Sequence, residues 1–502
     1  MLSCSLGRCD ETRRLARPSS EPRSERFTSA GIFGVSTWLA CSVAGEATSI
    51  SSEKAHHETW TKHPVNYSEI MLSHTDSGDT AWLLISSALV LLMTPALALF
   101  YGGMVRRKNV LATIVHSIVA IPILSLVWAL YGYTLAFGPS VHGLIGNVDH
   151  LFLNGLPGTV HGTVPTLAFV AFQMMFAVIT PALISGAFAE RISFRAYVAF
   201  IVAWSTFVYV PVAHWMWADG GWLRELGALD FAGGIVVHLT AGLSALVCAI
   251  VVGKRLGYPK HRVLPHDLTM TLTGAGLLWF GWFGFNAGSA PSSGHVAVLA
   301  FTTTHLGASG GALGWLAVEW WHRGKPTALG VASGLVAGLA TITPAAGFVA
   351  PWAALVIGLA AGGLCYRAVL LKDHFGYDDS LDAFGVHGVG GVLGAVLTGV
   401  FAQKVLNAEG ADGALFGNVH QLVVQLMACG ATAVYSIALT YGILKTIDAT
   451  LGLRVPESDE REGLDATQHG EEAYVDAVGI ASDTGVELQP SPLGAHRAPS
   501  HS

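Results

Sequence analysis

The sequence predicts an all-α integral membrane protein that crosses the bilayer many times. Of its 502 residues, 52% are hydrophobic and only 12% are charged, which is far more apolar than an ordinary soluble domain. From Ala81 onward, apolar stretches near the roughly 20 residues of a spanning helix recur along the chain. The 59 glycines are spread through these stretches, as expected for helices that pack closely in lipid. This composition excludes a soluble fold.

Eleven apolar stretches are predicted to be transmembrane helices. They cover residues 81–104, 110–137, 165–188, 194–213, 232–253, 267–288, 296–320, 327–343, 350–371, 384–403 and 418–446. We therefore expect a body of eleven helices over residues 80–450, between two segments of different composition.

The basic residues between these stretches predict the orientation of the chain, because cytoplasmic loops hold an excess of Lys and Arg. The even-numbered connections hold only two, Arg224 and Lys404. The odd-numbered connections hold thirteen: Arg106, Arg107, Lys108, Arg191, Arg195, Lys254, Arg255, Lys260, Arg262, Arg323, Lys325, Arg367 and Lys372. We expect the N-terminus outside and the C-terminus in the cytoplasm.

The two flanking segments are polar. Residues 1–79 form a leader with either a signal peptide near 26–44, a disordered stretch or a misassigned start, since the apolar run 30–43 is too short to span. Residues 451–502 form an acidic cytoplasmic tail, in which we expect 475–502 to be disordered. The six cysteines show no paired or metal-type spacing, and no basic patch points to nucleic acid.

Two histidines share a spacing that predicts an internal repeat. His238 follows Asp230 by eight residues in the fifth stretch, and His387 follows Asp379 by eight residues in the tenth. An Asp before an apolar run caps the free N–H groups of the first helical turn. Eight residues of α-helix rise about 12 Å, so both histidines are expected near the middle of the membrane.

The two stretches are five spans apart and therefore run in opposite directions. This pattern predicts two inverted five-helix repeats plus an extra C-terminal helix, with His238 and His387 meeting at the repeat interface. An ionisable residue at that depth is a functional candidate by default. The alternative is a packed histidine bonded to a neighbouring carbonyl, and we prefer it for His116 and His305, which have no repeat partner.

Four strings of the sequence resemble the ammonium transporter family. They are GAFAER at 186–191, DFAGGIVVH at 230–238, WFGFNAGSA at 282–290 and FGVHGVGG at 384–391. The resemblance covers about 79–474 and leaves out the leader. It implies eleven helices with an outer N-terminus, a homotrimer in the cytoplasmic (inner) membrane with one pore in each protomer, and neither enzymatic activity nor a cofactor.

The resemblance also implies roles for aromatic residues in the outer half of the membrane. Trp217, Phe176 and Ser289 look like the family's recruitment site for ammonium, and Phe176 and Phe285 are similar to its stacked gate. Physical chemistry agrees, because aromatic faces attract cations. Ser289 lies four residues after Phe285, on the same helical face, and its hydroxyl can accept a hydrogen bond from an N–H group, which potassium lacks.

Deeper residues complete the predicted path. His238 and His387 are similar to the twin-histidine pore of the family. Asp230 looks like the carboxylate beneath the recruitment site, and Asp379 matches an acidic position at the cytoplasmic end of the tenth helix. We expect ammonium to lose its proton near the gate and to pass the histidines as ammonia, while the route of the proton stays open.

The tail and three rival interpretations complete the expectations. Residues 452–474 resemble the family's C-terminal region, where a PII-type signalling protein docks, so we expect them to be ordered and regulatory. The rivals are an ammonium sensor with the same fold, a Rhesus-type gas channel and a membrane haem protein with paired histidine ligands. Trp217 and Ser289 favour the ammonium branch over the Rhesus branch, and the glycines around His387 disfavour a haem cavity.

Overall fold

The computed structural model describes residues 75–260 and 263–474. Chain contacts separate residues 1–64 from residues 65–502, and all described residues belong to the second unit. Residues 1–74 of the expected leader, with its signal peptide near 26–44, and residues 475–502 of the tail lie outside the described part, so those expectations stay predictions.

Helices form most of the described part of the chain. The first half contains α2 (Ser77–Met104), α3 (Val110–Val127), α4 (Tyr133–Phe137), α5 (Thr166–Phe188), α6 (Phe194–Trp204), α7 (Val210–Trp217), α8 (Trp222–Glu225) and α9 (Thr240–Val252). The second half contains α10 (Leu268–Trp282), α11 (His295–Arg323), α12 (Ala328–Ile342), α13 (Pro351–Phe375), α14 (Val389–Phe401), α15 (Val419–Thr450) and α16 (Glu457–Glu462).

Short helical turns of other pitch join or extend several of these helices. The π-helical turns are η2 (Trp128–Gly132), η4 (Ser205–Tyr209), η5 (Gly234–Leu239), η6 (Phe283–Ala287), η7 (Phe384–Gly388) and η9 (Asp465–His469). The 3-10 turns are η1 (Arg107–Asn109), η3 (Leu151–Leu153) and η8 (Ala414–Phe416).

In residues 75–474, ten helical segments are long and apolar enough to cross a membrane. They correspond to ten of the eleven predicted stretches. The other stretch, 327–343, forms the apolar helix α12, which has only 15 residues. Some residues of the charge count lie in helices and not in connections: Arg195 is in the first turn of α6, Arg323 ends α11, and Arg367 and Lys372 lie in α13.

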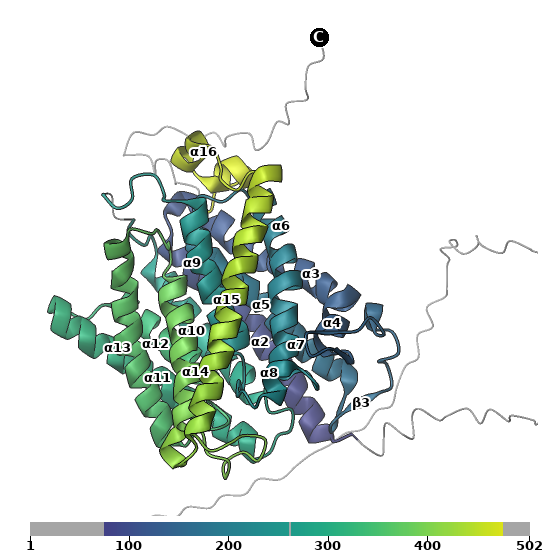
Figure 1. The fold of residues 1–502 in the computed structure, drawn as a ribbon. Helices are drawn as coiled ribbons and strands as arrows, with labels where there is room; N and C mark the ends of the chain where they lie inside the picture. Colours follow the sequence, from purple (N-terminus) through teal and green to yellow (C-terminus); the bar gives the residue numbers. More distant parts are fainter. Residues whose placement is uncertain (1–74, 261–262, 475–502) are drawn as a thin grey trace, which may run out of the picture. The chain divides into compact units, whose positions relative to one another are not determined.

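Glycines set the close packing of the bundle, whose helices are drawn in Figure 1. Helix α11 packs on α12 and α13, and α2 packs on α10. A Cβ atom at Gly311 of α11 would lie 2.4 Å from the carbonyl oxygen of Gly334 in α12. One at Gly362 of α13 would lie 2.2 Å from the carbonyl oxygen of Gly311. Larger residues would force these helices apart, so the glycines allow the backbone contacts that stabilise helix pairs in lipid.

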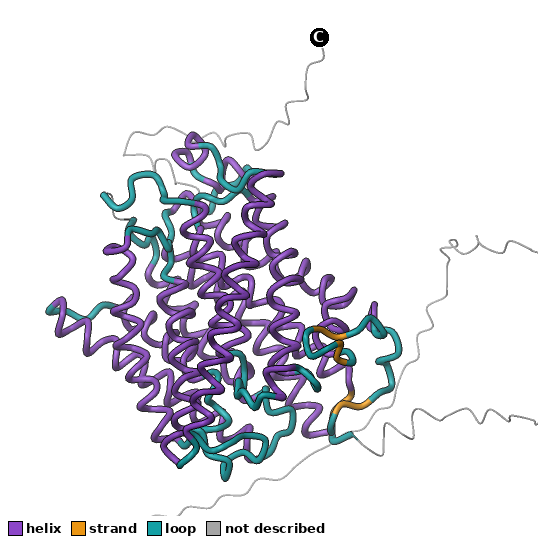
Figure 2. The backbone as a smooth tube through the Cα atoms, viewed as in Figure 1, coloured by secondary structure: helices purple, strands orange, loops and turns teal. Residues whose placement is uncertain are grey.

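Two antiparallel strand pairs lie between α4 and α5, and Figure 2 shows them in orange beside the purple helices. Strand β1 (Ser140–Val141) pairs with β2 (Ile145–Gly146), and β3 (Val160–His161) pairs with β4 (Val164–Pro165). The hydroxyl of Thr163, in the turn between β3 and β4, donates to the buried carboxylate of Asp79 in α2. This bond fixes the hairpin to the first helix.

The described part of the tail packs on one end of the bundle, where α16 follows α15 (Figure 1). The Asp465 carboxylate accepts the backbone N–H groups of Leu111 and Ala112 at 3.0 and 2.8 Å, which caps α3. The N–H of Leu464 donates to the Asn109 side chain at 2.8 Å. Residues 452–469 are therefore held by specific bonds to the helix ends.

Candidate functional site

The carboxylate of Asp230 organises the turn that carries His238. It accepts four backbone N–H groups, those of residues 233–236, at 2.6–2.9 Å. Gly233 has φ 109°, a conformation that favours glycine, and a Cβ atom there would lie 2.5 Å from the Val237 side chain. Asp230 thus satisfies the free donors at the start of η5, as a capping residue does.

Asp379 does the same for the turn that carries His387. Its carboxylate accepts the N–H groups of Ala383 and Phe384 at 3.1 and 2.8 Å. The side chain of Lys372 donates to the Asp379 carbonyl oxygen at 3.1 Å and pairs with the Asp382 carboxylate. The two segments with equal Asp-to-His spacing therefore have equivalent caps.

Both histidines lie on π-helical turns, which the sequence did not predict. The expected rise of 12 Å assumed a regular α-helix from each Asp, and this assumption was wrong. Residues 231–233 are bent, and η5 and η7 contain His238 and His387. A π-helical turn is wider than an α-helical one and is often found at functional sites.

The two imidazole rings face each other. Their centroids are 5.2 Å apart and their planes differ by 14°. The side chains of His238 and His387 are only 1% and 3% exposed. Both ring nitrogens of His238 and Nδ1 of His387 have no hydrogen-bond partner among the described residues. Buried polar atoms are nearly always paired, so these three nitrogens are available to a small solute.

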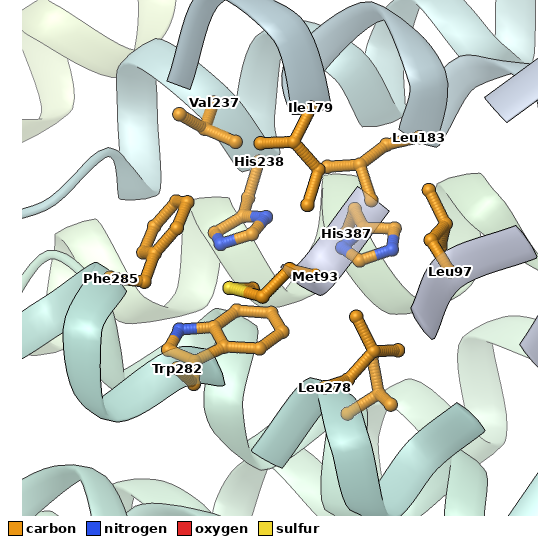
Figure 3. A pocket seen from close by; sticks show the side chains of 11 residues that line it. Met93, Leu97, Ile179, Leu183, Val237, His238, Leu278, Trp282, Phe285 and His387 are labelled. Atoms are coloured by element: carbon orange, nitrogen blue, oxygen red, sulfur yellow. The ribbon is translucent and has the colours of Figure 1, made fainter. Parts of the chain in front are cut away.

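The histidines line a narrow cavity of about 10 Å³, which we call the histidine cavity. Figure 3 shows the two imidazoles surrounded by apolar side chains. Their only atoms other than carbon are the Met93 sulfur and the Trp282 indole nitrogen. The other lining residues are Leu97, Ile179, Leu183, Val237, Leu278, Phe285 and Val336. In these surroundings a charged solute is strongly disfavoured over a neutral one.

Two glycines, each four residues after a histidine, allow the histidine turns to approach the neighbouring helix. Gly242 lies four residues after His238, and a Cβ atom on it would lie 2.0 Å from the Gly388 nitrogen of η7. Gly391 lies four residues after His387, and its Cβ atom would lie 2.6 Å from the Gly234 oxygen of η5. Each helix therefore needs a glycine at this position so that the other histidine turn can approach.

A stack of aromatic rings leads away from the histidines. The centroid of Phe285 lies 6.0 Å from that of His238 and 4.2 Å from that of Phe176. Phe176 and Phe285 are each 1% exposed, and their planes differ by 27°. Trp282 lies beside His238, with centroids 5.4 Å apart and an indole N–H bonded to Thr343. These rings close the direct route to the histidine cavity.

Beyond Phe176 lies a larger cavity of about 890 Å³, which we call the vestibule. Trp217 and Phe176 meet there edge to face, with centroids 5.9 Å apart. The indole N–H of Trp217 donates to the Asp230 carbonyl oxygen at 2.9 Å. The Ser289 hydroxyl donates to the Phe285 carbonyl oxygen at 2.9 Å, so its lone pairs remain free to accept a donor.

The structure thus groups seven of the eight predicted site residues around two cavities, which the stacked rings of Phe176 and Phe285 separate. Phe176, Trp217, Ser289 and Asp230 line the vestibule, while Phe285, His238 and His387 line the histidine cavity. Asp379 lies apart from both cavities and caps η7. Trp282 was missed as a lining residue, although it stands three residues before Phe285 in the motif at 282–290 and so shares its helical face.

A buried ion network lies at the end of the bundle that the tail covers. Arg255 pairs with Glu190 at 3.0 Å and with Asp378 at 2.8 Å, and Arg106 also pairs with Glu190 at 2.9 Å. Burial pushes the pKa of Glu190 upward, but Arg255 and Arg106 outweigh it and hold the pKa below its usual value. Asn109 joins Glu190 to the tail, since its amide donates to Glu190 and accepts from Leu464.

Comparison with known proteins identifies a family whose members match this chain. The model of the "Ammonium Transporter Family" matches residues 81–474. The ammonium transporter of Bacillus subtilis is 50% identical over 405 residues, which cover 80% of this chain and 99% of the relative. The crystal structure of Saccharomyces cerevisiae Mep2 is 37% identical with a TM-score of 0.72, covering 77% of this chain and 92% of that one.

A structure described as "Sensor Amt Protein" is also similar. It is 29% identical with a TM-score of 0.72, covering 80% of this chain and all of that chain. The fold and these relatives define a multi-pass membrane protein of the transporter or channel class. The chain belongs to the ammonium transporter family.

Proposed function

We propose that the protein binds ammonium in the vestibule, that the ion there loses a proton to water, and that the protein conducts ammonia past the two histidines. The observation that carries this proposal is the succession of rings from Phe176 through Phe285 and His238 to His387, with unpaired imidazole nitrogens in an apolar cavity. An ion would be solvated poorly on this path, whereas a small neutral molecule with N–H groups and a lone pair is well suited to it.

Recruitment of the cation is assigned to Trp217, Phe176 and Ser289. The aromatic faces contribute about 2 kcal/mol when the cation is desolvated, and Ser289 accepts one N–H. Proton loss is assigned to the neighbourhood of Phe176 and Phe285, where the path narrows to stacked rings. Asp230 acts on this region through its charge and as the cap of η5, without binding the solute directly.

The histidines are assigned the conduction step. Neutral imidazoles both donate and accept hydrogen bonds, so His238 and His387 can replace the water that ammonia loses. Asp379 is assigned a structural and electrostatic role at η7. The imidazole rings of His238 and His387 also offer a route for a proton. The proposed conduction of ammonia holds with or without that route.

The proposal includes an arrangement in the membrane. Eleven spans form two inverted five-helix repeats plus α15, with α12 as the eighth span, the N-terminus outside and the C-terminus in the cytoplasm. The equivalent caps and glycines of η5 and η7 support the repeat. The basic connections support the orientation. We further propose a homotrimer in the cytoplasmic membrane.

Residues 452–474 are proposed to regulate transport by docking a PII-type signalling protein at the cytoplasmic face. Bonds from Asp465 and Leu464 to the start of α3 support this role, because they would transmit a change in the tail to the helices. Residues 475–502 are proposed to be a disordered extension.

Two rival functions are less well supported. The sensor interpretation has a structural relative at 29% identity, whereas the transporter interpretation has a relative at 50%. A haem held between His238 and His387 does not fit, because the cavity of about 10 Å³ between close-packed glycines has no room for the macrocycle.

The function is tested by uptake and current measurements on the full chain in liposomes. Pulses of ammonium and methylammonium should each evoke transport, and a pulse of potassium at the same concentration should evoke none. An equal response to potassium would contradict the proposal. A site that binds its solute through N–H groups does not favour a cation that has none.

A further inference from the structure

Gln173 of α5 lies in the vestibule and has so far been given no role. It stands three residues before Phe176, on the same helical face, and lines the vestibule together with Trp217 and Ser289. Its amide is therefore close to the aromatic rings to which we assign the cation. A polar side chain at this position needs a reason, because a leucine or methionine would fill the same space.

The amide of Gln173 is not held by the protein. Its oxygen Oε1 is buried and has no hydrogen-bond partner in the described part of the chain. A buried carbonyl oxygen without a donor is unfavourable. The two ends of an amide have nearly the same shape, so rotation about the last side-chain bond exchanges NH2 and oxygen at little cost. A donor that enters the vestibule can therefore select the orientation in which the oxygen faces it.

Two carboxylates that line the vestibule are already engaged, whereas a third, that of Glu409, is exposed. The Asp230 carboxylate accepts four backbone N–H groups, and Asp219 pairs with Arg224 at 3.1 Å. The aromatic rings attract the charge of a cation but offer no directed lone pair. The Ser289 hydroxyl can accept one N–H. A second directed acceptor beside the rings would fix how ammonium is oriented.

We propose that Gln173 is a substrate-binding residue whose amide oxygen accepts an N–H of the ammonium ion held by Trp217 and Phe176. Ser289 accepts a second N–H of the same ion. This inference rests on the proposed function of the vestibule. It assigns selectivity to directed hydrogen bonds, because ammonium has four N–H groups in a tetrahedron and potassium has none.

The test compares variants of the full chain in liposomes by ammonium flux over a range of concentrations. Gln173→Leu removes the acceptor, and we expect the half-saturating ammonium concentration to rise about tenfold with the maximum flux within about twofold of the wild type. Gln173→Glu restores an acceptor and should bring that concentration back to the wild-type value or below. Gln403→Leu, which makes the same change outside the vestibule lining, should have no effect.

Each other outcome is decisive. A wild-type half-saturation in Gln173→Leu, with Trp217→Leu shifted, would overturn the role of Gln173 and leave the proposed function standing. A fall in maximum flux without rescue by Gln173→Glu would show a purely structural role. No ammonium flux in the wild type would overturn both proposals. Gln173→Met keeps the side-chain length and replaces Gln173→Leu if that variant does not insert.

Discussion

At the residue scale, different residues of the vestibule attract the cation and accept its hydrogen bonds. Trp217 stands edge to face with Phe176, and its indole N–H is fixed on the Asp230 carbonyl oxygen. The ring therefore keeps its place whether or not a cation is present, and its face supplies attraction without a formal charge. The Ser289 hydroxyl adds an acceptor, because its own proton is donated to the Phe285 carbonyl oxygen.

Trp217→Leu should weaken the binding of ammonium more than it reduces the maximum flux. The loss of about 2 kcal/mol of cation–π attraction corresponds to a rise of about thirtyfold in the half-saturating ammonium concentration. The measurement is ammonium flux in liposomes with and without competing potassium. Trp352→Leu, the same change at an exposed position, is the control. A half-saturating ammonium concentration equal to that of the wild type would disprove the cation–π role.

The sequence predicted many site residues but not their surroundings. The equal spacing of Asp230 and Asp379 from their histidines is visible in the sequence because a cap and its helix are local. The orientation of the Gln173 amide and the contact of Trp282 with His238 depend on helices distant in the sequence. No periodicity within one helix contains that information.

At the element scale, the helices were predictable and the π-helical turns were not. Ten apolar stretches correspond to helices long enough to span, because hydropathy and length largely determine a transmembrane helix. Helix α9, which continues η5, packs on η7, and α14, which continues η7, packs on η5. Gly242 and Gly391 are the residues that permit this packing, and in sequence they look like any other glycine of an apolar stretch.

Gly242→Ala should reduce transport strongly. Its methyl group would lie 2.0 Å from the Gly388 nitrogen, so α9 and η7 must separate and the histidine rings must shift. The measurement is ammonium flux normalised to the amount of protein inserted. Gly276→Ala of α10 is the matched control, because nothing lies within 4 Å of the added methyl group. Equal flux in the two variants would show that the glycine contact does not set the pore.

At the scale of the whole molecule, one buried ion network connects the tail with the histidine helices. Glu190 bonds to Asn109, which binds the tail at Leu464, and Arg255 bonds to both Glu190 and Asp378. Asp378 precedes Asp379, the cap of η7. The network therefore couples the position of the tail to the segment that carries His387.

Glu190→Gln should lower the free energy of unfolding by about 3 kcal/mol, because it leaves part of a buried charge network unpaired. Glu457→Gln is the control and should have almost no effect, since its pair with Arg461 is exposed. The measurement is thermal unfolding of purified protein in detergent. A loss for Glu190→Gln no larger than that of the control would contradict this account.

The same variant makes a prediction about pH. The pKa of Glu190 is lowered in the folded protein, so its stabilising contribution is complete above its ordinary value of 4.5 and disappears as the pH falls through the lowered pKa. The difference in unfolding midpoint between the wild type and Glu190→Gln should be constant above pH 4.5 and shrink below it. A difference that grows on acidification would contradict the ion pairs.

The central claim is that His238 and His387 line the conduction path, and flux through single-histidine variants tests it most directly. Ammonium and methylammonium uptake, with current, would be recorded in liposomes that contain His238→Ala, His387→Ala or the control His305→Ala. The control ring stacks on Trp279 outside the histidine cavity. We predict that the first two variants insert normally but lose or severely alter transport, while the control behaves as the wild type. Unchanged uptake and current in both cavity variants would contradict the claim.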